Sequence, residues 1–177
     1  FHQFISSNLK KNKIRKIVEV GSNDLYLLKK FYKKSRNLIG IDPVVKKDKK
    51  YKKIKIFKEF FDNVSDTKIG SGTDVIISGH TLEHVENPET FLRKILSISE
   101  KKTKIFFQFP SLESMVNNVS FDQIHHQHLN YFSINSFNKL LKKCGGKVIN
   151  YAYNEVHYGA LMVYFTINAS EKKSHKK

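Results

Sequence analysis

Cysteine is nearly absent from this chain of 177 residues, which contains only Cys144. A single cysteine excludes a disulfide framework, and a zinc site built from several cysteines, within the chain. It fits a reducing compartment, so we expect a cytoplasmic protein. No apolar run reaches the ~18–20 residues of a membrane-spanning helix, so we expect no membrane partner. Because the chain begins with Phe rather than Met, we expect the natural protein to start upstream, which leaves a removed signal peptide open.

Arginine is also scarce, although the chain is strongly basic. Lys and Arg total 32 against 16 Asp and Glu, which gives a net charge of +16, yet only three of the basic residues are arginines. Proteins that read nucleic acids rely on arginine for bidentate contacts. The densest basic run, residues 46–58, alternates with apolar residues and is typical of a solvated face that could attract a diphosphate. We expect no specific nucleic-acid partner, although a nucleic-acid-binding protein stays a rival interpretation.

What the sequence does contain is a regular alternation of short apolar runs and amphipathic stretches. This pattern predicts βαβ units around a largely parallel sheet. The predicted strands are residues 17–20, 38–41, 54–57, 74–78 and 105–109, followed by 148–151 and 160–167 as an antiparallel pair. The predicted helices are residues 25–33, 88–99 and 137–143, the last capped by Ser133 or Asn135. Residues 111–127 lack a clean period and are expected to form a loop with a short helix.

A glycine turn follows the first predicted strand, in the sequence VEVGSNDL. A buried strand, a tight turn at Gly21 and a helix N-terminus form a place where a ligand can approach the backbone closely. Asp42 ends the next strand, and in open α/β sheets an acidic residue at this position binds ribose hydroxyls. Gly21, Asp24 and Asp42 therefore indicate a nucleotide-type cofactor site. The absence of a GxxxxGK[ST] sequence argues against a P-loop.

Two histidines follow the fourth predicted strand, in the sequence SGHTLEH. His80 lies at the carboxyl end of that strand, where polar side chains face the ligand crevice of an open α/β sheet. His84 comes one helical turn later. For His84, this segment alone favours a local capping or packing role over a role in binding a ligand in the crevice.

A second histidine cluster lies in the sequence FDQIHHQHLNYFS, which holds His125, His126 and His128 within four residues. Because the unperturbed pKa of histidine is close to neutral pH, such a cluster indicates proton transfer or metal binding. No cysteine lies nearby and no HExxH pattern is present, so we expect no metal. We favour proton transfer by His125 or His128 and a structural role for His126.

The segments VEVGSND, GIDP, SGHTLEHVENPETFL, FDQIHHQHLNYFS and VHYGALMVYF together resemble successive signatures of class I S-adenosylmethionine-dependent methyltransferases. More narrowly, they resemble the sugar C-methyltransferases of deoxysugar pathways, and the histidine-rich segment is the specific part. The resemblance implies a Rossmann-like α/β fold, with a mostly parallel seven-stranded sheet, helices on both faces and an antiparallel last strand. It also implies that residues 1–168 are the methyltransferase domain, the central catalytic domain of that family. The residues that follow, 169–177, are mostly polar, and we expect them to form a polar tail.

The resemblance further implies S-adenosylmethionine as the cofactor and a small-molecule acceptor, a nucleotide-linked keto-deoxysugar. His128 is implied to be the catalytic base that removes a proton next to the ketone, so that the resulting enolate attacks the electrophilic methyl group. Catalytic His125 and His84 are implied to polarise or orient the sugar. The residues implied to bind the cofactor are Gly21, Ser22, Asn23, Asp24, Asp42 and His80, with Phe61 or its neighbour Phe60 near the adenine. No metal is required for this chemistry.

The chain departs from the family pattern at several positions. Leu25 stands where the family has Gly and is expected to crowd the cofactor turn, His125 replaces a Tyr and Gln127 replaces a Glu. The segment HYGALM at residues 157–162 lacks a Gly and an Arg of the family pattern. Two further interpretations therefore stay open: an O- or N-methyltransferase acting on another small molecule, and a non-catalytic cofactor-fold module. The sequence does not indicate an oligomeric state.

Overall fold

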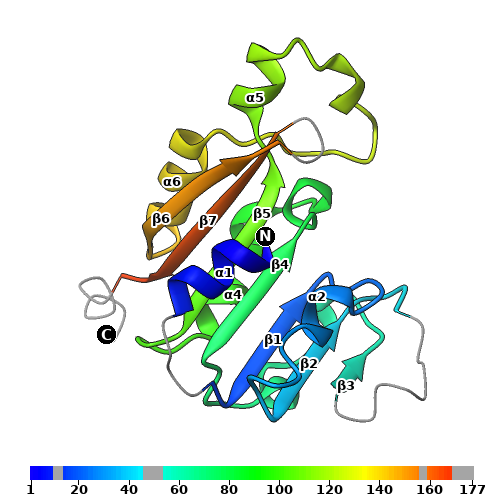
Figure 1. The fold of residues 1–177 in the computed structure, drawn as a ribbon, viewed down its shortest axis with the longest axis vertical. Coiled ribbons are helices and arrows are strands. Elements are labelled where there is room, and N and C mark those ends of the chain that lie inside the picture. Colours follow the sequence, from blue (N-terminus) through cyan, green and yellow to red (C-terminus); the bar gives the residue numbers. More distant parts are fainter. Residues whose placement is uncertain (10–13, 46–53, 156–158, 169–177) are drawn as a thin grey trace.

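A computed structural model describes residues 1–9, 14–45, 54–155 and 159–168 of the chain. These residues contain a seven-stranded sheet in the order β3-β2-β1-β4-β5-β7-β6 (Figure 1). The strands are β1 (Lys16–Val20), β2 (Asn37–Ile41), β3 (Ile54–Phe57), β4 (Val75–Gly79), β5 (Lys104–Pro110), β6 (Gly146–Asn154) and β7 (Ala160–Ile167). The neighbouring pairs are parallel except those of β7, which runs antiparallel to both β5 and β6. The predicted Rossmann-like sheet with an antiparallel last strand is confirmed.

Helices cover both faces of the sheet, as predicted. The α-helices are α1 (His2–Leu9), α2 (Tyr26–Lys29), α3 (Asp66–Ile69), α4 (Pro88–Ser97), α5 (Leu112–Asn117) and α6 (Ile134–Lys143), and the short 3₁₀ helices are η2 (Phe61–Asn63), η3 (Leu82–His84) and η4 (Phe121–Gln123). Figure 1 shows α1 lying across one face of the sheet. Within the described residues, no helix is long and apolar enough to cross a membrane.

Two apolar clusters, one on each face, hold the helices to the sheet. The first joins the strands to α4 and α6, with Phe91 and Phe137 fully or almost fully buried. The second joins them to α1 and the region around α2, with Ile5 and Phe31 at 0% exposure. Because both faces are covered, the central parallel strands are rich in Ile and Val rather than alternating with polar residues. All five residues of β1 are buried.

Side-chain caps fix where the helices begin. The side chain of Asn87 accepts a hydrogen bond from Thr90 N, with Pro88 in the first turn of α4. A capping box between Ser133 and Ser136 starts α6, which settles the cap on Ser133 rather than Asn135. The helix predicted at residues 25–33 is shorter than expected, because only Tyr26–Lys29 are α-helical and turns follow.

An arm that contains α5 and η4 projects beyond the carboxyl ends of the parallel strands (Figure 1). Its helix α5 is the short helix expected within residues 111–127, and the Ser111 side chain caps it. The predicted tail at residues 169–177 lies outside the described residues. So does most of the basic run at residues 46–58, of which only 54–58 are described.

Candidate active site

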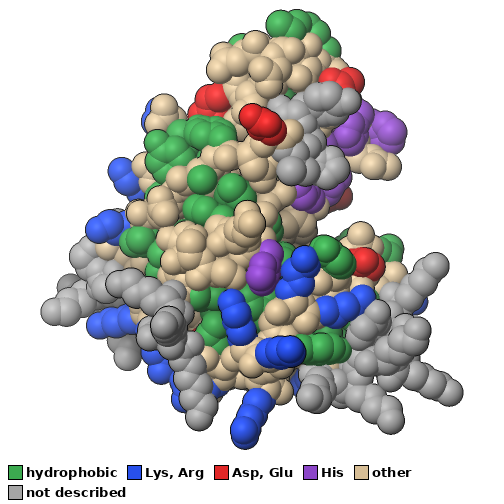
Figure 2. All heavy atoms as spheres, in the orientation of Figure 1, with side chains coloured by type: hydrophobic (Ala, Val, Ile, Leu, Met, Phe, Trp, Pro, Cys, Tyr) green, Lys and Arg blue, Asp and Glu red, His purple; other side chains and the backbone are tan. Residues whose placement is uncertain are grey.

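The histidine-rich loop packs against η3 at the carboxyl ends of β4 and β5. Leu129 N donates to the Glu83 backbone carbonyl at 2.7 Å, and the Asn130 side chain donates to the Leu82 carbonyl at 3.4 Å. The His84 ring also contacts the loop, through the Gln127 carbonyl at 2.8 Å. These bonds bring together two histidine motifs that are far apart in the sequence. Figure 2 shows histidine side chains at the edge of the arm and directly below it.

His84 and His128 are each held through Nδ1 by a backbone carbonyl. Nδ1 of His84 lies 2.8 Å from the Gln127 carbonyl, and Nδ1 of His128 lies 3.1 Å from the Gln123 carbonyl. Because a carbonyl oxygen can only accept, each Nδ1 carries the proton and each Nε2 keeps its lone pair in the neutral ring. The two ring centroids lie 5.0 Å apart. Gln127 acts here through its backbone, so the family's Glu at this position is not needed to hold His84.

The surroundings of His128 favour the neutral form of its ring. Partial burial lowers the pKa of His128, and the neighbouring His125 lowers it further. The negative charge of Glu83 and the hydrogen bond to the Gln123 carbonyl oppose this shift. His125 itself is exposed, with its ring centroid 3.8 Å from that of His128. A neutral imidazole with a free Nε2 is the form that can accept a proton.

Glu83 is a site residue that the sequence analysis did not select. Its side chain is buried at 2% exposure, and its Oε1 lies 3.1 Å from His80 Nδ1. Nε2 of His80 lies 2.7 Å from the side-chain amide nitrogen of Gln108 on β5. A chain of hydrogen bonds thus runs from Gln108 through His80 to Glu83. His80 was predicted to bind the cofactor. In the structure its side chain is hydrogen-bonded to the buried carboxylate of Glu83. The sequence feature that could have pointed to Glu83 is its position between His80 and His84.

The glycine turn after β1 is closely packed. Gly21 has φ +75°, and its N–H donates to the Ile41 carbonyl at 2.9 Å. A Cβ at Gly21 would lie 1.9 Å from Thr81 Oγ1, so the turn leaves no space for a side chain there. Ser22 is buried, and its Oγ has no hydrogen-bond partner among the described residues. Asn23 and Asp24 are exposed on the outside of the turn.

Asp42 connects the ends of the first two strands. Its Oδ2 accepts from Asn23 N at 2.9 Å and its Oδ1 accepts from Val44 N at 2.8 Å. Behind it, burial raises the pKa of Glu19 on β1 to about 8, and the nearby Asp24 and Asp42 also raise it. Three carboxyl groups therefore gather at this end of the sheet. Because its raised pKa keeps Glu19 protonated near neutral pH, Asp42 is the carboxylate of this group that can accept from a ligand's hydroxyl groups.

Comparison with known proteins identifies the family to which this chain belongs. A family profile described as "Methyltransferase domain" matches residues 1–151. The chain belongs to the methyltransferase domain family. Among curated proteins, the C-methyltransferase NovU of Streptomyces niveus is 25% identical, with the match covering 84% of this chain and 36% of that protein. The chain therefore spans about a third of the length of this relative.

Solved structures share the fold of this methyltransferase domain. One is a chain from the complex between the Haloferax volcanii Trm112 methyltransferase activator and a methyltransferase, with a TM-score of 0.75 and 12% identity over 93% of this chain and 88% of that one. Another is the Burkholderia thailandensis 1,6-didemethyltoxoflavin-N1-methyltransferase, whose structure contains its substrate and S-adenosylhomocysteine. Its TM-score is 0.71, with 10% identity over 94% of this chain and 76% of that one. At these identities the likeness establishes the fold.

Two residues that the sequence placed near the cofactor, Leu25 and Phe61, have buried side chains in the structure. Leu25 has φ +64° but does not crowd the cofactor turn, because its side chain is fully buried in the apolar cluster, against Gly40 of β2. Phe61 is 6% exposed and packs edge-on against Phe91, so it lies in the core rather than at a surface where adenine could stack. Its neighbour Phe60 is 67% exposed and is the ring that faces solvent.

Replacing Gly21 with alanine should destabilise the glycine turn. A left-handed backbone costs an L-residue roughly 1–2 kcal/mol, and overpacking against Thr81 adds about 1–3 kcal/mol. Gly72 is a matched control, because its φ is +77° and a Cβ there would meet nothing within 4 Å. Urea unfolding should show a larger loss of unfolding free energy for Gly21→Ala than for Gly72→Ala. Equal losses would mean that the contact with Thr81 costs nothing.

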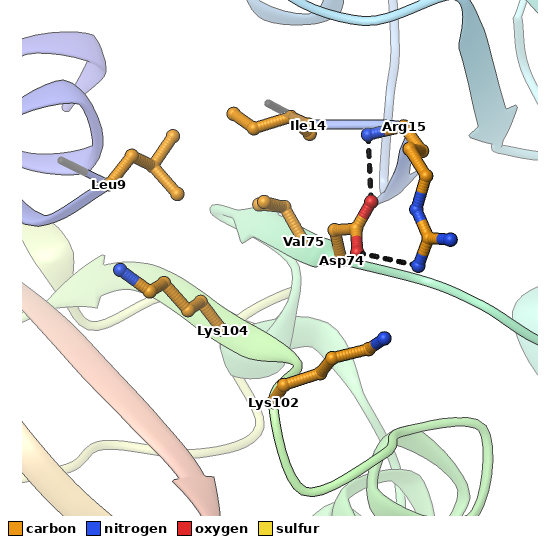
Figure 3. Close-up of a pocket in the computed structure, with 7 residues that line it drawn as sticks. All are labelled: Leu9, Ile14, Arg15, Asp74, Val75, Lys102 and Lys104. Carbon is orange, nitrogen blue, oxygen red and sulfur yellow. Dashed lines mark hydrogen bonds and ion pairs between the residues drawn. The ribbon is translucent and has the colours of Figure 1, made fainter. Parts of the chain in front are cut away.

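A cavity of about 290 Å³ lies at the opposite end of the sheet (Figure 3). Asp74 forms one side of it, accepting from Arg15 N at 2.7 Å and pairing with the Arg15 guanidinium at 3.5 Å. The other residues that line the cavity are Leu9, Ile14, Val75, Lys102 and Lys104. Apart from Leu9 of α1, these residues lie at the amino ends of β1, β4 and β5, whereas ligands of open α/β sheets bind at the carboxyl ends. We therefore place the candidate active site at the histidine cluster and the glycine turn.

Proposed function

We propose that this methyltransferase domain transfers a methyl group to carbon in a nucleotide-linked keto-sugar, with His128 as the base. The observation that supports this most is the tautomer of His84 and His128. In each ring the Nδ1 N–H donates to a backbone carbonyl, which leaves Nε2 available to accept a proton or a hydrogen bond. The similarity to a C-methyltransferase supports carbon as the acceptor atom. The deoxysugar pathway and the nucleotide part follow from the motif resemblance and belong to this proposal.

As a methyltransferase domain, the chain takes S-adenosylmethionine as its methyl donor. When bound, this cofactor supplies an electrophilic methyl group. The turn fits it on one count: Ser22 Oγ is buried without a hydrogen-bond partner among the described residues, so a polar group of the cofactor can supply one. Asp42 would accept from the ribose hydroxyls through lone pairs that its two backbone bonds leave free. Asn23 and Asp24 would contact the methionine part.

The base acts through a defined atom. His128 Nε2 accepts the proton from the carbon next to the ketone, and the ring becomes an imidazolium. The buried Glu83 carboxylate, whose charge already favours the protonated form of His128, stabilises that imidazolium. Because Nδ1 of His84 donates to the Gln127 carbonyl, Nε2 of the neutral ring would accept from a sugar hydroxyl and orient it, rather than polarise the ketone. The ring of exposed His125 lies beside that of His128, tilted against it, and would contact the sugar.

The test is a labelled reaction on a nucleotide-linked keto-sugar. In deuterium oxide, with the demethylated cofactor present so that no methyl transfer can follow, the proton next to the ketone should exchange. With S-adenosylmethionine present, the product should gain one methyl group on that carbon by mass and NMR. A methyl group on oxygen or nitrogen would instead favour the rival small-molecule methyltransferase. No transfer to any acceptor would favour a non-catalytic module.

Replacing Asp42 with alanine should weaken cofactor binding by about 10–100-fold, because a lost hydrogen bond to a charged acceptor costs about 1.5–3 kcal/mol. Calorimetry with S-adenosylmethionine measures the change, after the wild-type affinity has been established. Since Asp42 also accepts two backbone N–H groups, the titration must be run below the melting temperature of the variant. The control is Asp62→Ala, an exposed aspartate of η2. A folded Asp42→Ala protein with wild-type affinity would remove Asp42 from the cofactor site.

A further inference from the structure

Three potential metal ligands converge at the carboxyl end of β4. Glu83 and His84 come from η3, and His128 comes from the histidine-rich loop that packs on it. One ligand atom from each residue, a ring nitrogen or a carboxylate oxygen, lies within 4.8 Å of the other two. Tetrahedral zinc, with ligands at about 2.0–2.1 Å, has its ligand atoms ~3.4 Å apart. The most distant pair of ligand atoms must therefore close by as much as about 1.4 Å around an ion.

The two histidines already have the outer partners that metal-binding histidines need. A histidine that binds a metal through one ring nitrogen almost always donates its other N–H to a carbonyl or carboxylate, which fixes the tautomer and the ring plane. Nδ1 of His84 and Nδ1 of His128 make such bonds, to the backbone carbonyls of Gln127 and Gln123. Both Nε2 atoms are therefore left as the ligand atoms.

Glu83 provides an independent observation that points to a ligand. It is 98% buried, and its Oε2 has no hydrogen-bond partner among the described residues. Its other oxygen is held by His80, which is in turn held by Gln108. A buried carboxylate oxygen without a partner is costly unless it meets a proton or a cation. We propose that Glu83, His84 and His128 form a binding site for a divalent transition-metal ion of the zinc class.

The ligand set selects the kind of ion. Two imidazoles and one carboxylate suit zinc, cobalt or nickel, whereas magnesium and calcium prefer oxygen ligands alone. Three protein ligands leave a position open for water or an acceptor oxygen. If His128 is also the base proposed above, the ion occupies the nitrogen that takes the proton, so a bound ion stops turnover. That consequence, but not the site itself, rests on the proposed function.

Calorimetric titration of the whole chain with Zn²⁺ alone tests the site. We expect a single saturable ion per chain, with the affinity reduced about 100-fold or more in Glu83→Gln and His84→Ala, because loss of an outer partner alone costs about 10–100-fold. His84 is exposed, so its replacement leaves the core intact. The control is His126→Ala, an exposed histidine of the same loop that is not among the three. It should bind Zn²⁺ as the wild type does.

The visible absorption spectrum of bound Co²⁺ provides a second measurement of metal binding, and this measurement does not depend on enzymatic activity. The visible absorption of a bound Co²⁺ ion should appear in the wild type and in His126→Ala, and should be lost in His84→Ala. Absence of saturable binding, or equal affinity in wild type, Glu83→Gln and His84→Ala, would overturn the proposal. Turnover of the protein in the presence of a chelator tests the role of His128 as a base separately. The two proposals can therefore fail independently of each other.

Discussion

Replacing His128 with alanine lowers turnover on a keto-sugar acceptor by about 10²–10⁴-fold, the usual contribution of a general base. Cofactor affinity stays at the wild-type value. The reason is location, because His128 sits with η3 beyond β4, whereas the glycine turn and Asp42 lie at the ends of β1 and β2. Steady-state kinetics with a chelator present, together with calorimetry on S-adenosylmethionine, measure the two quantities.

The matched control for this prediction is His126→Ala. It removes an exposed imidazole from the same loop without touching the carbonyl bonds that hold His84 and His128. A role specific to the base also predicts that deuterium exchange next to the ketone disappears with His128 while the Michaelis constant changes little. Full turnover in His128→Ala would contradict the role of His128. If the variant also melts far earlier and binds no cofactor, His128 is structural.

Much of the sheet could be predicted because its strands are short Ile, Val and Phe runs that end at turn residues. The strand at residues 38–41 and that at 105–109 were placed to within one residue of β2 and β5. Helix α1 was not predicted, because an eight-residue segment with only Ile5 and Leu9 buried carries too weak a period. The helix after the glycine turn was overextended, since the sequence does not reveal that only four of its residues complete α-helical geometry.

The site could be predicted only as far as strand order allows. The residues that follow β1, β2 and β4 must lie at the same end of a parallel sheet. This brings Gly21, Asp42 and His80 to that end. Which side chain turns inward is decided by tertiary packing. Glu83 was missed because the sequence does not show that it is buried while the adjacent His84 is exposed. For the same reason, the choice between Phe60 and Phe61 depended on whether the ring packs on Phe91.

Glu19 should make the stability of this domain depend strongly on pH. Burial raises its pKa to about 8 in the folded chain, whereas an unfolded glutamate titrates at ~4.3. Between these values the folded state holds a proton that the unfolded state has lost. The free energy of unfolding therefore falls by about 1.4 kcal/mol for each pH unit as the pH rises, which totals roughly 4–5 kcal/mol across the window. Below the unfolded pKa this stability is fully present, and above pH 8 no more is lost.

Replacing Glu19 with glutamine removes this dependence, because an amide does not titrate. Urea unfolding at pH 5, 6, 7 and 8 should show Glu19→Gln gaining on the wild type by about 1.4 kcal/mol per unit. A constant offset from the amide's own hydrogen bonds does not alter that slope. Glu59→Gln is the control, because Glu59 is a surface carboxylate paired with Lys68, and its curve should run parallel to the wild type. Parallel curves for Glu19→Gln as well would mean that Glu19 is ionised in the folded chain, with Asp24 and Asp42 too distant or too well screened to oppose its charge.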